Sequence, residues 1–184
     1  METMDTSWSA ALWRQFGAAI DMLDNALAAC PEELWQEPLW PIPADQPLAP
    51  EFAAFWYVGY HALFWLDFYL TGSKEGFAPP APITLAEFDP DGALPERPYT
   101  QEELRAYLAY TRQKGQTILL ALTDELARRP FEFSWAHGQP ASFLELQLYN
   151  LRHVQEHAAQ LSLFLGQHAI SAGPSWVARA KGEG

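Results

Sequence analysis

The sequence predicts an all-α protein with the architecture of a four-helix bundle. Four long segments carry apolar residues at helical spacing, and no alternating strand pattern lies between them. Of the 184 residues, 49% are hydrophobic and 14% are aromatic, so the chain can bury a sizeable core. No segment has the composition of a linker between domains, and we therefore expect one domain over residues 1–184.

The first expected helix covers residues 8–29. Leu12, Phe16 and Ile20 lie on one side of it, and polar residues lie opposite. The helix ends before Pro31, because helical backbone is disfavoured in the residue that precedes a proline.

The second expected helix begins near Pro50, a residue well suited to the first helical turn. It ends at Thr71, where Gly72 occupies the position that favours left-handed backbone. Its residues are apolar on nearly all sides, so we expect it to be the most buried helix.

The third and fourth expected helices both begin with a capping box, in which a Ser or Thr is followed three residues later by Glu. Thr100 and Glu103 form this pattern at the start of the third helix, whose apolar stripe continues to Leu126. Ser142 begins the fourth helix in the same way, and this helix continues to about Gln167.

The connections before and after the second helix are long and rich in proline. Residues 31–49 contain five prolines together with Trp35 and Trp40, and residues 73–99 form a still longer link. Loops of this length inside a compact domain are usually lids or crossovers. They allow the helices to depart from simple up-and-down order, although the sequence pattern leaves that order open.

The composition excludes several classes of function. The formal net charge of −12 argues against binding to nucleic acid or to anionic lipid. The one cysteine, Cys30, cannot form an internal disulfide, which suits a reducing compartment. The N-terminus lacks the pattern of a secretory signal, and the most apolar segment, residues 52–66, is shorter than a spanning helix. We therefore expect a cytoplasmic protein without a membrane or nucleic-acid partner.

Three histidines lie where amphipathic helices should face the core. His61 is in the middle of the second expected helix, and His153 and His157 are one turn apart in the fourth. Residues four apart share a helix face, about 6 Å apart along the axis, and can bind one metal ion while the backbone stays helical. A polar ring that is buried without a partner costs about 1–3 kcal/mol, so these rings need hydrogen bonds or a metal.

The three histidines together predict a metal site. Alone, His61 is better explained as a hydrogen-bonded core residue, and the pair of His153 and His157 fits a metal site or a solvated face equally well. Their conjunction on inward faces favours one divalent ion with positions left open for water or substrate, which is the form of a catalytic site. Imidazole suits several ions, of which we take zinc first and nickel, iron or manganese as alternatives. His137 and His168 are in or beside loops, and we expect both to be solvated.

A second motif overlaps the histidine pair. Residues 153–157 match the H-x-x-E-H string of inverted zinc peptidases, in which the glutamate is a general base. Only one acidic residue, Glu183, follows the motif, so the expected downstream carboxylate ligand is missing. Glu156 points away from the apolar face, where pairing with Arg152 explains it. We treat the match as coincidental and keep Glu156 as a candidate for proton transfer.

Two further side chains are candidate catalytic residues. Tyr57 is one turn before His61, and Asn150 is on the inward side of the fourth helix near His157. Either could contact the substrate or the metal ligands. An aromatic core residue and a helix-packing amide are equally good explanations of the two. Three tryptophans from the loops and the tail could wall the pocket or simply pack: Trp35, Trp40 and Trp176.

The chain resembles the DinB/YfiT-like superfamily of four-helix metal-binding proteins over nearly its whole length. The resemblance rests on YVGYHALFW at residues 57–65, on LYNLRHVQEHAAQL at residues 148–161 and on the closing residues 175–181. It implies an up-down-down-up bundle, a divalent metal held by the three histidines, and frequent formation of homodimers.

The resemblance also implies a range of activities. Characterised members include thiol-dependent S-transferases and a maleylpyruvate isomerase, and many others are described only as metal-dependent hydrolases. The chain keeps all three histidines but has no further motif that selects a thiol cofactor. We therefore expect a metal-dependent transferase of the thiol S-transferase type, or a hydrolase, acting on a small molecule with or without a thiol cosubstrate. The alternatives are a non-catalytic, metal-containing binding or stress-associated module and a metal-free bundle.

Overall fold

The computed structural model describes residues 7–43, 45, 49–132, 140–174 and 176–181. The predicted all-α bundle is confirmed. The helices in these ranges are α1 (Trp8–Ala29), α2 (Phe55–Thr71), α3 (Gln101–Leu120), the short α4 (Asp124–Ala127) and α5 (Phe143–Gln167). Two short strands, β1 (Pro130–Glu132) and β2 (Pro140–Ser142), pair antiparallel between α4 and α5. None of the helices in the described ranges combines the length and the hydrophobicity needed to span a bilayer.

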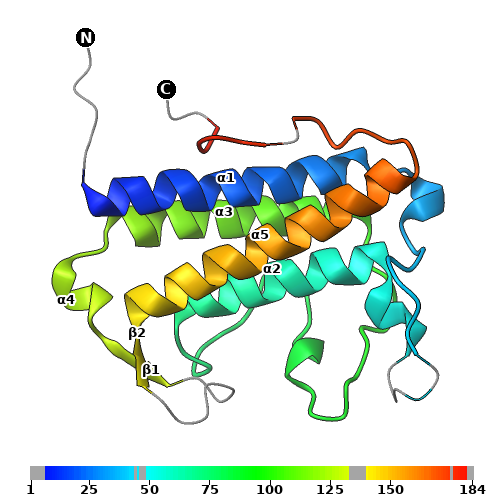
Figure 1. The fold of residues 1–184 in the computed structure, drawn as a ribbon. Coiled ribbons are helices and arrows are strands. Elements are labelled where there is room, and N and C mark those ends of the chain that lie inside the picture. Colours follow the sequence, from blue (N-terminus) through cyan, green and yellow to red (C-terminus); the bar gives the residue numbers. More distant parts are fainter. Residues whose placement is uncertain (1–6, 44, 46–48, 133–139, 175, 182–184) are drawn as a thin grey trace.

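The four long helices enclose one apolar core. α1 packs against α3 and α5, and α2 packs against the same two helices, so α1 and α2 occupy opposite corners of the bundle. Figure 1 shows α1 and α5 running in one direction and α2 and α3 running in the other. Because α2 and α3 are parallel, the chain between them must return along the length of the bundle. The Pro-rich residues 73–99 make this return.

α2 begins later than the sequence predicts. A single 3-10 turn (Pro50–Ala53) and one extended residue precede the helix, which starts at Phe55. The first Pro-rich connection causes the break, because it forms hydrogen bonds with this segment. The backbone N–H of Phe55 donates to the carbonyl of Glu37 at 3.0 Å, and that of Leu39 donates to the carbonyl of residue 53 at 2.8 Å.

α3 ends at Leu120, before the predicted Leu126. Thr123 begins α4 instead, and its hydroxyl accepts a hydrogen bond from the backbone N–H of Leu126 at 3.2 Å. Leu126 is therefore 48% exposed, whereas Leu122 stays in the core. The β1–β2 hairpin is absent from the sequence prediction, because strands of three residues that begin with proline carry no alternating pattern.

The other predicted helix boundaries are confirmed. Thr100 and Glu103 form both hydrogen bonds of the capping box, at 3.1 and 2.8 Å. Ser142 accepts from the backbone N–H three residues later at 3.2 Å. Gly72 ends α2 with a φ of 70°, and a Cβ there would lie 2.8 Å from the ring of Phe143, so this position requires glycine.

Buried amides hold α5 against α2. The Gln147 side chain donates to the carbonyl of Tyr69 at 2.8 Å, and the Asn150 side chain donates to the carbonyl of Leu66 at 3.2 Å. Both amides are fully buried. They fix the position of the following turns of α5 relative to the middle of α2.

A buried ion pair holds α2 against α3. Asp67 is 1% exposed, and one of its carboxylate oxygens accepts from the Lys114 ammonium at 2.5 Å. The other oxygen accepts from the Tyr107 hydroxyl at 2.9 Å, and Lys114 also donates to the hydroxyl of Thr71 at 2.6 Å. α2 is thus fixed by polar contacts on both of its neighbours.

The C-terminal segment lies along α1 (Figure 1). The backbone N–H of Ala180 donates to the carbonyl of Arg14 at 3.0 Å, and that of Lys181 donates to the Asp21 carboxylate at 2.5 Å. A Cβ on Gly17 would lie 2.6 Å from the Cβ of Ala180. The small residue at position 17 is therefore what allows the tail to approach the helix this closely.

Candidate metal centre

The three predicted histidines converge at one point between α2 and α5. The Nε2 atoms of His153 and His61 lie 3.2 Å apart, and those of His157 and His153 lie 3.1 Å apart. One ring nitrogen from each residue falls within 4.8 Å of the others. All three side chains are half-buried, with 32% of the His61 side chain exposed.

The outward-facing nitrogens of two of these rings have hydrogen-bond acceptors. His61 donates from Nδ1 to the Glu87 carboxylate at 2.9 Å, and His157 donates from Nδ1 to the side-chain oxygen of Gln160 at 2.8 Å. A proton on Nδ1 leaves Nε2 with a free lone pair. Two lone pairs therefore point toward the Nε2 atom of His153. His153 can donate its single proton to only one of them at a time.

Among the described residues, the His153 ring also lacks a hydrogen-bond partner at its second nitrogen. Its Nδ1 is buried and has no hydrogen-bond partner within the described part of the chain. Burial, together with the neighbouring His157 and His61, lowers the pKa of His153 to about 2. Burial and the neighbouring His61 also lower the pKa of His157. Both rings are therefore held neutral, which is the form that binds metal ions.

The family comparison agrees with this geometry. The sequence model of the DinB superfamily matches residues 14–161, which is most of the chain and includes all three histidines. This chain belongs to the DinB superfamily. The resemblance drawn from the short histidine motifs is thereby confirmed. A comparison with curated proteins gave no match. The family assignment and the histidine cluster of this DinB protein are both compatible with metal binding.

Glu87 is the residue of the centre that sequence reasoning misses. It lies in a 3-10 turn (Ala86–Phe88) within the return between α2 and α3. Its carboxylate accepts from the Tyr57 hydroxyl at 2.6 Å, from His61 at 2.9 Å and from the Trp65 indole at 2.6 Å. Burial opposes the negative charge, but these three donors outweigh it and hold the pKa of Glu87 below its usual value. No periodic pattern marks this position, because the turn belongs to a Pro-rich loop.

The other candidate residues differ in how they are connected to the centre. Tyr57 reaches it indirectly, through its hydrogen bond to Glu87. Burial and the nearby Glu87 carboxylate raise the pKa of Tyr57, so its phenol stays protonated. Asn150 is fully buried and bonds to the α2 backbone. Glu156 is exposed and lines a groove between α1 and α5 with Trp176, away from the α2 side of α5.

The remaining sequence candidates have other partners. Trp35 is buried and donates from its indole to the carbonyl of Tyr99 at 2.8 Å, whereas Trp40 is 41% exposed. His168 is exposed at the end of α5, where Nδ1 lies 2.9 Å from the carbonyl of Phe164. His137 lies outside the described residues.

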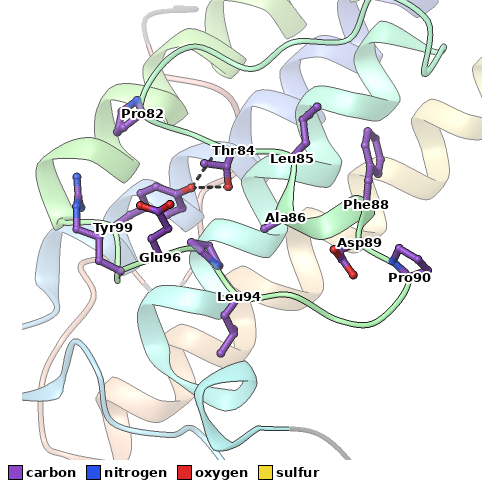
Figure 2. Close-up of a pocket in the computed structure, with 12 residues that line it drawn as sticks. Pro82, Thr84, Leu85, Ala86, Phe88, Asp89, Pro90, Leu94, Glu96 and Tyr99 are labelled. Atoms are coloured by element: carbon purple, nitrogen blue, oxygen red, sulfur yellow. Dashed lines mark hydrogen bonds between the residues drawn. The ribbon is translucent and has the colours of Figure 1, made fainter.

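The return between α2 and α3 also lines an open cavity of about 700 Å³ (Figure 2). Ala86 and Phe88, the neighbours of Glu87, line it. Tyr99 forms the opposite wall, and its hydroxyl accepts from the backbone N–H of Thr84 at 3.0 Å. One turn of chain therefore faces the histidine cluster with Glu87 and faces this cavity with the residues on either side.

Proposed function

We propose that this DinB protein binds one divalent metal ion through His61, His153 and His157, and that the loaded protein is a metal-dependent enzyme. The reaction class is transfer to a small molecule, of the thiol S-transferase type, or hydrolysis of one. The observation that carries the proposal is the convergence of three Nε2 atoms that present more lone pairs than His153 can satisfy with its one proton.

The donor set fits a metal ion. Nitrogens bound to one zinc ion at 2.0–2.1 Å in a tetrahedron lie about 3.3–3.4 Å apart, close to the 3.1 and 3.2 Å separations here. A cation accepts all three lone pairs at once, which the single proton of His153 cannot do. Zinc is the ion we expect, with nickel, iron or manganese as alternatives.

Partial exposure of the centre supports a chemical role. The exposed third of the His61 side chain shows that solvent reaches one side of the cluster. A divalent ion held there would lower the pKa of a bound water, or of a substrate thiol, toward neutrality. The Tyr69 and Tyr149 rings pack against one another at 5.6 Å beside His153 and give that side an aromatic wall.

Metal analysis tests the binding step. The full-length chain, purified without a histidine tag and dialysed against zinc, should retain about one equivalent of metal. His61→Ala and His153→Ala should each reduce that content severalfold, because a two-histidine remnant holds the ion weakly. His168→Ala is the matched control, since it removes an imidazole outside the cluster. Near-zero zinc in the wild type, or equal zinc in all four proteins, contradicts the proposal.

A reaction screen tests the catalytic step. Zinc-loaded protein should accelerate thiol conjugation to electrophiles or hydrolysis of small esters, and His153→Ala should abolish that activity. Turnover that survives His153→Ala contradicts metal catalysis. Retention of metal without turnover of any substrate in the screen would instead favour the non-catalytic, metal-containing module.

A further inference from the structure

We infer that Glu87 is the positioning residue of the histidine centre: its carboxylate fixes the His61 ring so that Nε2 presents a lone pair to the other two histidines. The inference rests on the proposed metal binding for its purpose. Its geometry is independent of that proposal, because every contact lies within the chain itself.

The contacts of Glu87 all come from one side of α2. Tyr57, His61 and Trp65 are spaced four residues apart, so they stack along a single face of the helix. Tyr57 donates to one carboxylate oxygen at 2.6 Å. His61 and Trp65 donate to the other at 2.9 and 2.6 Å. Only 6% of the Glu87 side chain is exposed, so the carboxylate is committed to these three donors.

This arrangement determines which nitrogen of His61 carries the proton. A carboxylate can only accept hydrogen bonds, so the ring must present an N–H to it. The proton therefore stays on Nδ1, and Nε2 is left free. The negative charge also makes the imidazole a stronger electron donor, which is the usual effect of a carboxylate behind a metal-binding histidine.

The three rings are supported unequally. His61 is backed by a carboxylate, His157 by the neutral amide of Gln160, and His153 by no partner within the described residues. We therefore expect the negative charge at Glu87 to matter more for metal affinity than the amide at Gln160. The same contact ties the return between α2 and α3 to the centre.

Two measurements on the full-length chain test this role. The first is nitrogen-15 NMR of the metal-free wild type, in which His61 should exist as the Nδ1–H tautomer. Finding the Nε2–H tautomer would overturn the inference without any variant. The second is a competition titration of Zn²⁺ against a chromophoric chelator for the wild type and Glu87→Gln. The amide keeps the size of the side chain and removes its charge, so zinc affinity should fall about 10–100-fold.

Glu96→Gln is the matched control. It removes one negative charge from the same connection at an exposed position that lines the cavity of Figure 2. Its zinc affinity should stay within about threefold of the wild type, because solvent and salt screen an exposed charge. Equal affinities for Glu87→Gln and Glu96→Gln would overturn the inference. A wild type that binds no zinc would instead overturn the proposed function, while the tautomer still decides the role of Glu87.

Discussion

The buried ion pair between α2 and α3 allows a quantitative prediction about what holds the helix of His61 in place. Among the residues that the structure describes, Lys114→Met leaves the Asp67 carboxylate with one side-chain hydrogen bond, from Tyr107, and no counter-charge. Asp67 is 1% exposed and cannot turn to water. Breaking a buried ion pair by removing one partner costs about 3–5 kcal/mol. We therefore expect Lys114→Met to lower the free energy of unfolding by about 3 kcal/mol or more.

Removing the other charge of the pair should lower the free energy of unfolding by less. The Lys114 side chain is 21% exposed, so in Asp67→Asn the ammonium can shift toward solvent and keep its bond to Thr71. Losing one hydrogen bond between charged groups costs about 1.5–3 kcal/mol. The double variant removes both charges and leaves an amide for Tyr107. It should therefore be more stable than Lys114→Met alone.

Urea unfolding of the four proteins, followed by circular dichroism in the presence of a chelator, measures these differences as a double-mutant cycle. We expect a coupling energy above about 1.5 kcal/mol between positions 67 and 114. A coupling near zero would refute the reasoning. So would a larger loss for Asp67→Asn than for Lys114→Met, because burial would then not be what decides the cost.

Four further predictions concern the site, the core and the tail. Zinc at 100 times its dissociation constant should stabilise the fold by about 2.7 kcal/mol, and a melting temperature equal in zinc and in chelator contradicts this. Asn150→Ala should lower stability by about 1–3 kcal/mol without changing turnover per bound metal; a pure loss of turnover would make Asn150 catalytic. Burial and Glu33 raise the pKa of Cys30 to about 12, so iodoacetamide labelling should stay slow from about pH 7 to 9. The unfolded thiol ionises near pH 9. The contribution of this thiol to the free energy of unfolding is therefore complete below that pH and is lost as pH rises toward 12. Labelling as fast as that of a free thiol would contradict the raised pKa and the pH dependence that follows from it. Gly17→Leu should displace Ala180 and speed proteolysis of the C-terminal segment, and an unchanged cleavage rate contradicts that contact.

Helical periodicity predicts the features of this fold that depend on local sequence. The stripes and caps place α1 and α5 and the start of α3 correctly, because capping and amphipathicity act within a few residues. The start of α2 is wrong by about one turn, since the backbone N–H of Phe55 donates a hydrogen bond to Glu37, in the preceding Pro-rich connection. The predicted end of α3 is wrong because Thr123 caps a new helix, α4. The apolar stripe continues through this break, so the pattern does not reveal it.

The candidate site divides in the same way. His61, His153 and His157 are predictable because helix spacing determines the face on which each residue lies, and the bundle brings those faces together. The position of Glu87 depends on how a Pro-rich loop crosses the bundle, which no local pattern encodes. Asn150 also shows the limit of periodicity, because the helical wheel gives its direction but not its bond to Leu66.

The parallel arrangement of α2 and α3 explains both the long connection and the place of Glu87. A helix of 17 residues is about 25 Å long, so the chain leaving α2 must travel that distance back before α3 can begin. Glu87 lies near the middle of this return, and His61 lies near the middle of α2, so the two meet where the return passes alongside the helix. The connection required by the topology therefore also supplies the carboxylate behind the first histidine.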